Sequence, residues 1–247
     1  MEIKKRKYRH ELKFIINKNM AQILKQRLSL IMDIDQNSVN EDNTYLIRSL
    51  YFDDSDSSAY YEKLDGILYR KKYRIRVYNN DTSFIRLERK LKHNNMTSKD
   101  QIKIDIDTCN KILQNNVNNI KINEDLNKKV KSCKMELNSK NDLLQDFIYE
   151  IKHKGLKPSI IVDYKRLAYT YPVSDVRITF DENLKSGLYN YNLFDSNMIT
   201  YDVLEPNEVV LEVKFNEILP ESIAIILQTV PMYRLAVSKF ANCRELK

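Results

Sequence analysis

Strict alternation between charged and apolar residues is the feature that most constrains the fold of this chain. Within residues 71–78, Ile75 and Val77 alternate with lysines and arginines, and residues 83–92 and Glu208–Phe215 repeat the pattern. Side chains two positions apart in a β-strand point to the same face of the sheet. The alternation therefore predicts antiparallel strands with one apolar face and one charged face.

Helices are predicted between and after these strands. The predicted strands cover residues 8–16, 46–52, 71–78, 83–92, 101–107, 158–165, 177–181 and 208–215. The predicted helices cover the segment after Asn17, residues 57–64, parts of 110–154, Glu221–Leu227 and the segment after Pro231. This many strands exceeds what one open sheet usually holds, so the expected fold class is α+β with an antiparallel sheet that curls or closes.

No repeat and no Pro/Gly/Ser-rich linker divides the chain. One domain over residues 1–247 is therefore expected, with a helical insertion at about 110–157. Residues 33–44, which are polar, are expected to form a loop.

The charged faces of the predicted strands carry more basic than acidic side chains, as in Arg86, Glu88 and Lys90. A solvated polar face explains any one such strand. Across all of them, this much like charge favours a bound anion, and a closed sheet would place these side chains in its lumen. Polyphosphate with a divalent metal fits, because Arg and Lys bind phosphate oxygens while carboxylates share the cation.

Glycine is too scarce for a phosphate-binding loop made of backbone amides. The chain of 247 residues has three glycines, Gly66, Gly155 and Gly187. A Walker loop needs two glycines around one turn, and a dinucleotide fingerprint needs three close together. Any phosphate bound by this chain, whose formal charge is +7, is therefore expected to be held by side chains.

Other absences narrow the class of protein. The longest strongly apolar stretch, residues 223–227, is far shorter than the ~20 residues that span a bilayer, and the charged N-terminus leads into no apolar signal core. Cys109, Cys133 and Cys243 form no C-x-x-C pair and indicate free thiols in a reducing compartment. A cytoplasmic protein without a membrane span is expected. The oligomeric state is left open.

The sequence pI of about 9.0 raises nucleic acid as a partner. Basic charge alone attracts many anions, and the sequence contains no helix-turn-helix or RNA-recognition motif. Nucleic acid is therefore not expected as a partner.

Seven short motifs occur in an order that resembles a known family. They are Glu11-Leu12-Lys13-Phe14, Leu50-Tyr51-Phe52-Asp53, Tyr73-Arg74-Ile75-Arg76-Val77-Tyr78, Leu87-Glu88-Arg89-Lys90, Val176-Arg177-Ile178-Thr179-Phe180-Asp181, Leu211-Glu212-Val213-Lys214 and Ser238-Lys239-Phe240. Together, over about residues 8–240, they resemble the polyphosphate polymerase domain of the vacuolar transporter chaperone (VTC) family, within the triphosphate tunnel metalloenzyme or CYTH-like superfamily. The resemblance implies an eight-stranded antiparallel β tunnel, a closed barrel with flanking helices.

The resemblance also implies an activity and site residues. The implied reaction transfers the terminal phosphoryl group of ATP, or another nucleoside triphosphate, to inorganic polyphosphate with Mn²⁺ or Mg²⁺ as cofactor. The basic residues implied to act on the reacting phosphates are Lys13, Arg74, Arg76, Lys90, Arg166 and Arg177. Further phosphate contacts are implied for Lys63, Lys99, Tyr164, Lys214, Ser238 and Lys239. Glu212, assisted by Glu88 or Glu11, is implied to hold the metal.

Two departures from the family pattern bear on the activity. Arg9 stands two residues before Glu11, where the superfamily often has a glutamate. Ala236 stands where a lysine is expected, and Arg234 is its nearest substitute. The first departure weakens a triphosphatase assignment, because hydrolysis usually needs more metal-binding carboxylates. A triphosphatase of the same superfamily and a non-catalytic polyphosphate-binding or triphosphate-binding protein are the alternatives.

Overall fold

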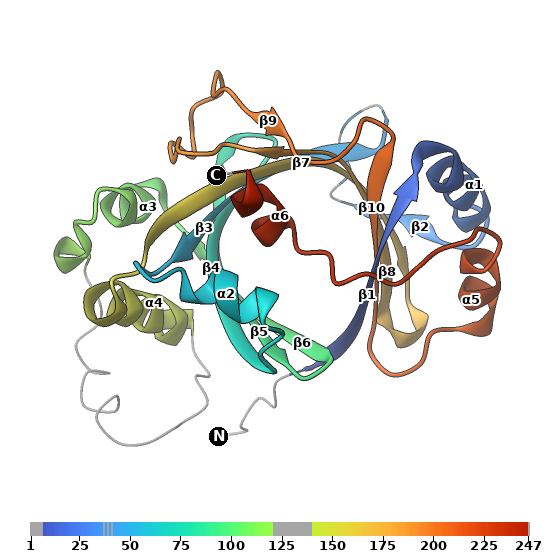
Figure 1. Ribbon diagram of the computed structural model, residues 1–247, viewed down its shortest axis with the longest axis horizontal. Coiled ribbons are helices and arrows are strands. Elements are labelled where there is room, and N and C mark those ends of the chain that lie inside the picture. The colour runs from blue at the N-terminus through green and yellow to red at the C-terminus, as the bar shows by residue number, and fades with distance from the viewer. Residues whose placement is uncertain (1–6, 37, 39, 41, 121–139, 247) are drawn as a thin grey trace.

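Eight antiparallel strands close into a ring in the computed structural model (Figure 1). The structure describes residues 7–36, 38, 40, 42–120 and 140–246. Around the ring, the strands are β7 (Lys157–Tyr171), β3 (Thr44–Asp53), β4 (Tyr69–Tyr78), β5 (Asp81–His93), β6 (Met96–Ile104), β1 (Arg9–Asn17), β10 (Glu208–Phe215) and β8 (Val176–Ser186). Pairing of β8 with β7 completes the ring, which confirms the predicted α+β fold with a closed antiparallel sheet.

The ring is a tunnel rather than a regular barrel. Neighbouring strands share long registers, except that β1 meets β6 through only two residue pairs, Arg9 with Thr97 and His10 with Met96. Two short strands, β2 (Asp33–Ile34) and β9 (Tyr201–Asp202), extend the sheet beside β7 and β8.

The β4–β5 hairpin shows how local sequence sets the direction of the charged side chains. Asn79 and Asn80 adopt positive φ values of 49° and 55°, which a tight hairpin turn requires and asparagine tolerates. The resulting register places Arg74 opposite Glu88 and Arg76 opposite Arg86 on one face of the sheet. A shift by one residue would exchange the charged and apolar faces, so this turn fixes which side chains enter the lumen.

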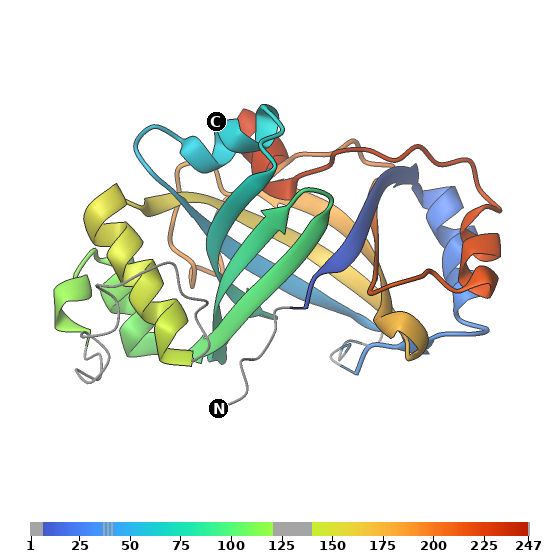
Figure 2. The ribbon, with the colours of Figure 1, turned by 90° about the horizontal axis from the view of Figure 1, so that it is seen from below.

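Six α-helices occur within the described residues, at the sides and at one end of the ring (Figures 1 and 2). They are α1 (Lys18–Leu28), α2 (Ser58–Leu64), α3 (Ile106–Leu113), α4 (Lys140–Lys154), α5 (Glu221–Leu227) and α6 (Lys239–Glu245), with short 3-10 turns η1 (Val117–Asn119) and η3 (Val173–Asp175). Figure 2 shows α2 and α6 lying together at one end of the tunnel. That end is called the α2 mouth.

Two apolar clusters lie between the outer face of the sheet and the helices, whereas a third contains Tyr45, Tyr164 and Phe240, which line the cavity. On one side, Phe147 of α4 packs in a cluster with Ile75 and Leu87 of the sheet. On the other side, Leu24 of α1 and residues of α5 pack in a cluster with Ile178. Because the apolar faces are covered from outside, the charged faces of the same strands must point into the lumen.

The predicted strand at 101–107 is wrong at both ends. β6 begins at Met96 and stops at Ile104, because Asp105 caps α3 by accepting a hydrogen bond from the Thr108 backbone N–H at 2.7 Å. A polar side chain at this position ends the strand and begins a helix.

Two other boundaries differ because tertiary contacts override local pattern. No helix follows Pro231 directly, and α6 begins only at Lys239. Residues 231–238 instead cross one opening of the ring (Figure 1), where the Leu235 backbone N–H donates to the Lys13 carbonyl at 2.9 Å. The predicted loop at 33–44 contains β2 and the first residue of β3.

Between β6 and β7, the described residues form α3, η1 and α4. Residues 121–139, including Cys133, lie outside the described residues, whereas Cys109 and Cys243 are free and buried. Among the described residues, no helix combines the length and apolar character that crossing a membrane requires.

Candidate functional site

The lumen of the ring holds a cavity of about 810 Å³. Sixteen Lys and Arg side chains line it against two carboxylates, whereas the whole chain has 41 basic and 34 acidic residues, so the excess positive charge is concentrated in the lumen. The lining strands contribute alternate residues, for example Arg74 and Arg76 from β4. The cavity is therefore suited to a polyanion.

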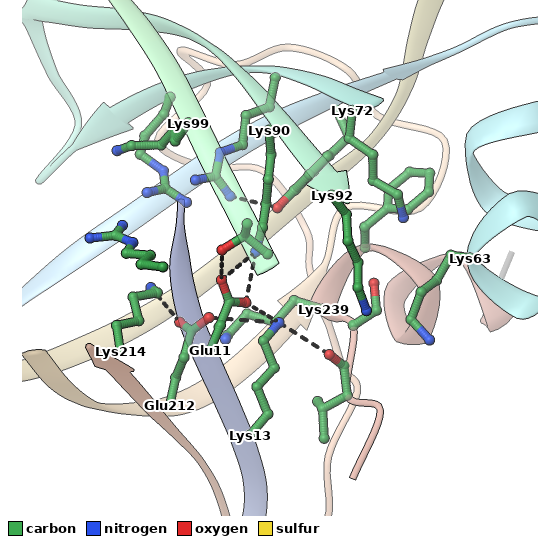
Figure 3. Close-up of a pocket in the computed structure, with 18 of the residues that line it drawn as sticks. Glu11, Lys13, Lys63, Lys72, Lys90, Lys92, Lys99, Glu212, Lys214 and Lys239 are labelled. Atoms are coloured by element: carbon green, nitrogen blue, oxygen red, sulfur yellow. Dashed lines mark hydrogen bonds and ion pairs between the residues drawn. The ribbon is translucent and has the colours of Figure 1, made fainter. Parts of the chain in front are cut away.

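Glu11 of β1 and Glu212 of β10 are these two carboxylates, and three lysines surround them (Figure 3). Lys13 Nζ lies 3.2 Å from Glu11 Oε1 and 3.7 Å from Glu212 Oε1. Lys90 Nζ donates to Glu11 at 2.7 Å, and Lys214 Nζ donates to Glu212 at 2.8 Å. The register of β1 with β10, which sets Lys13 opposite Glu212 and Glu11 opposite Lys214, creates this arrangement.

The lysines keep both carboxylates ionised. Burial and the neighbouring Glu212 oppose ionisation of Glu11, but Lys90, Lys13 and Lys214 outweigh them and lower its pKa to about 2. The pKa of Glu212 is also held well below its usual range, because Lys214, Lys13 and Lys239 outweigh its burial. Burial lowers the pKa of Lys214 to about 7 despite these partners.

A buried arginine–glutamate group lies on β4 and β5. Glu88 Oε2 accepts from Arg74 Nε at 2.6 Å, while Glu88 Oε1 accepts from Lys99 Nζ at 3.2 Å. Arg76 donates to Ser49 Oγ and Tyr164 Oη, both at 3.0 Å. Glu88 does not line the cavity, and only 1% of its side chain is exposed, so it acts as a buried support for Arg74.

The wall formed by β7 and β8 repeats this support of a cation by a buried acid. Asp181 accepts from Arg166 Nε at 2.5 Å and Nη2 at 2.7 Å, and its other neighbour, Lys239 Nζ, lies 2.6 Å away. Burial opposes ionisation of Asp181, but Arg166 and Lys239 lower its pKa to about 2. Arg177 donates to Tyr45 Oη at 2.9 Å and lies 2.6 Å from Asp35.

At the α2 mouth, the basic side chains lack such support. Lys63 of α2, Lys72 of β4 and Lys92 of β5 line the cavity, and no carboxylate among the described residues lies within 4.0 Å of their amino groups. Lys72 Nζ lies 4.2 Å from the centre of the Phe240 ring, and Arg70 donates to the Glu62 carbonyl oxygen at 3.1 Å. The cavity wall thus has a region with paired cations and a region with unpaired ones.

Most of the residues predicted for the site lie on the cavity wall. The predicted residues that line it are Glu11, Lys13, Lys63, Arg74, Arg76, Lys90, Lys99, Tyr164, Arg166, Arg177, Glu212, Lys214, Ser238 and Lys239. Glu88 is the exception, since its side chain is only 1% exposed and contacts Arg74 and Lys99, which do line the cavity. Ser238 also caps α6, where its hydroxyl accepts from the Ala241 backbone N–H at 3.3 Å.

Arg70, Lys72 and Lys92, which were not predicted as site residues, also line the cavity. The alternation along the strands could have identified them, because residues two apart share a face of the sheet. Lys72 is two residues from Arg74, Lys92 is two from Lys90, and Arg70 is two from Lys72. The motif resemblance did not include them. Arg234, considered as a substitute for the missing lysine at Ala236, does reach the cavity wall.

The residues present fit a divalent metal held jointly with phosphate. Mg²⁺ is typically bound by one or two carboxylates together with substrate phosphate oxygens. Glu11 and Glu212 are both ionised and already accept one cation, Lys13, between them. No group of three His, Cys, Asp or Glu side chains suited to a metal occurs in the described part of the chain. Any metal here would therefore need oxygens from the ligand.

A closed antiparallel ring around a basic lumen is the architecture of the triphosphate tunnel, or CYTH-like, class. The sequence profile of the VTC domain matches residues 8–246, and the chain belongs to that family. No curated protein matches the chain.

Solved structures are similar to this chain at low sequence identity. A Hippeastrum protein that carries an adenylyl cyclase name and is described as having a dominant triphosphatase activity is 16% identical, with a TM-score of 0.50 over 98% of this chain and 96% of that chain. A Pyrococcus horikoshii protein is 10% identical, with a TM-score of 0.45 over 96% of this chain and 100% of that chain. The Hippeastrum similarity shows a shared fold.

Proposed function

We propose that this protein transfers the terminal phosphoryl group of a nucleoside triphosphate, such as ATP, to the end of an inorganic polyphosphate chain inside the tunnel. The observation that carries the proposal is the cavity lined by sixteen basic side chains, with its two carboxylates side by side. A basic lumen binds a polyanion, and two adjacent carboxylates add the means to place a metal on its phosphates. Membership of the VTC domain family supports the same function.

The arginines would clamp the triphosphate. Arg74, Arg76 and Arg166 are oriented by Glu88, Tyr164 and Asp181, and a guanidinium can donate two hydrogen bonds to one phosphate. Arg177, Lys99, Lys214, Ser238 and Lys239 line the same wall and would add phosphate contacts. Pre-oriented donors do not need to reorganise when charge moves during the reaction.

The transfer step needs positioning more than acid–base chemistry. A terminal phosphate oxygen of the acceptor forms a bond to the γ-phosphorus, the bond from that phosphorus to the β–γ bridging oxygen breaks, and the nucleoside diphosphate leaves with the electron pair. The attacking oxygen is already ionised, so no protein base is required. Lys13 and Lys90, which lie beside the two carboxylates, would offset the charge around the transferred group.

Glu11 and Glu212 would hold Mn²⁺ or Mg²⁺, and the cation would supply positive charge that offsets part of the charge of the phosphates. For this, Lys13 must leave its position between the carboxylates and donate to phosphate instead.

The test incubates purified protein with ATP, Mn²⁺ and a short polyphosphate primer and follows chain length on a gel. We expect chains to lengthen, and we expect Glu212→Gln to slow lengthening at least about a hundredfold, because it removes a metal ligand at similar size. Glu217→Gln, which changes an exposed glutamate away from the cavity, is the matched control and should leave the rate unchanged.

Two other results would contradict the proposal. Release of free phosphate without lengthening would identify a triphosphatase, in which water replaces the acceptor. Binding of polyphosphate with neither reaction would identify a binding protein.

A further inference from the structure

We infer that Lys63, Lys72 and Lys92, together with Arg70, form a separate subsite that binds the polyphosphate acceptor chain without a metal ion at the α2 mouth. This inference rests on the proposed function, because it assigns one of the two substrates of that reaction to a defined end of the tunnel. These four residues form no ion pair with the two cavity carboxylates, Glu11 and Glu212.

The geometry separates this group from the carboxylates. The four side chains come from α2, β4 and β5, and Figure 3 shows Lys63, Lys72 and Lys92 gathered on the α2 side of the cavity, away from Glu212. The strand register places Arg70 opposite Lys92 and Lys72 opposite Lys90. Two successive basic pairs thus lead along the wall from the α2 mouth to Lys90, which contacts Glu11. This row suits a chain of consecutive phosphates.

No carboxylate of the described residues forms an ion pair with these four cations. Burial lowers the pKa of Lys72 to about 7, and repulsion from Arg70, Lys13, Lys63 and Lys90 adds to that effect. Burial and the neighbouring cations likewise lower the pKa of Lys92.

The pKa of Lys63 is lowered by burial, Arg70 and Lys13, and that of Arg70 is lowered by burial. Three acids act in the opposite direction without forming an ion pair with their target: Glu245 on Lys63, Glu11 on Lys92 and Glu62 on Arg70. Like charges held this closely are costly until an anion fills the space between them.

The chemistry of the group favours inorganic polyphosphate. No carboxylate of the described residues lines this part of the cavity to share a divalent cation, so the ligand must be neutralised by ammonium and guanidinium groups alone. A lysine ammonium is a point charge without the planar bidentate geometry of a guanidinium, so it can bind a chain of repeating phosphates in more than one register. A bound chain would also raise the pKa of Lys72, so binding above pH 7 should take up protons.

The test compares two ligands by calorimetry in Lys72→Gln/Lys92→Gln. Inorganic tripolyphosphate with EDTA probes the metal-free subsite, and a non-hydrolysable ATP analogue with Mn²⁺ probes the carboxylate end. We expect the double variant to lose at least about tenfold in tripolyphosphate affinity, because two charge-assisted contacts are removed, and to change less than about threefold toward the analogue. Lys152→Gln/Lys157→Gln removes the same charge from exposed positions outside the cavity and is the matched control.

Equal affinity of the double variant and the control for tripolyphosphate would overturn the inference, as would equal losses toward both ligands. The proposed function fails separately. If the wild type lengthens no chains but tripolyphosphate affinity still depends on Lys72 and Lys92, the subsite stands and the polymerase assignment falls. If chains lengthen and the tripolyphosphate affinity does not depend on these lysines, the polymerase assignment stands and the subsite falls.

Discussion

Two regions of the tunnel wall carry positive charge in opposite ways. Around β1, β8 and β10, the cations are paired: Lys13 lies between Glu11 and Glu212, and Arg166 is held by Asp181. At the α2 mouth, Lys72 and its basic neighbours lack an acid within ion-pair distance among the described residues. Paired cations are held in place before a ligand arrives, whereas unpaired ones gain their main partner only from the ligand.

The largest effect should come from removing one member of a buried pair. Arg74→Ala should lower the free energy of unfolding by about 2–4 kcal/mol, because buried Glu88 would lose its closest cation and keep the longer contacts with Lys99 at 3.2 Å and Arg76 at 3.8 Å. Urea unfolding measures this loss, and adding Glu88→Gln should restore part of it. No loss of stability in Arg74→Ala would show that water reaches Glu88. The ion pairs would then contribute little to the difference between the two regions of the tunnel wall.

A smaller loss is expected where the partner that the acid keeps lies closer. Arg166→Ala should cost about 1–3 kcal/mol, because Lys239 Nζ still lies 2.6 Å from Asp181. The same unfolding measurement should rank it below Arg74→Ala. A loss as large as that of Arg74→Ala would mean that Lys239 does not compensate Asp181.

The smallest effect, a gain rather than a loss of stability, is expected for Lys72, which forms no ion pair with a described residue. The pKa of Lys72 is lowered from 10.5 to about 7, so between these values the unfolded chain binds more protons than the folded one. Folding is therefore penalised fully below pH 7, and the penalty fades as pH rises toward 10.5. Lys72→Met should raise the free energy of unfolding by about 1–2 kcal/mol at pH 6, and that gain should shrink by pH 9.

Lys152→Met is the control for this pH series, because Lys152 is exposed on α4. A stability gain from Lys72→Met that does not change with pH would assign it to apolar contact with Phe240 rather than to relieved charge repulsion.

Alternation along the strands was enough to predict much of the site. It placed Arg74, Arg76 and Lys90 on the polar faces, and the closed ring turns those faces inward. It could not show that Glu212 lines the cavity whereas Glu88 does not, since both alternate with apolar neighbours in the same way. That difference depends on which side chains from adjacent strands reach each carboxylate.

Helices and connecting segments were harder to predict because their positions depend on distant contacts. Residues 231–238 have no pattern that would predict an extended path, yet the Leu235 backbone bonds to that of Lys13 at the far end of the sequence. Lys63 likewise reaches the cavity because α2 packs against both α6 and β4.

The sequence by itself determined a basic polar face on each of several strands, because the two-residue period of a strand sorts charged from apolar side chains without reference to the rest of the chain. It also excluded a glycine-based phosphate loop. Only the tertiary structure decided that these faces form one lumen and which cations there are paired. Ring closure brings together side chains from β1, β5 and β10 that lie far apart in sequence, and a lysine's charge state depends on those neighbours rather than on its own segment.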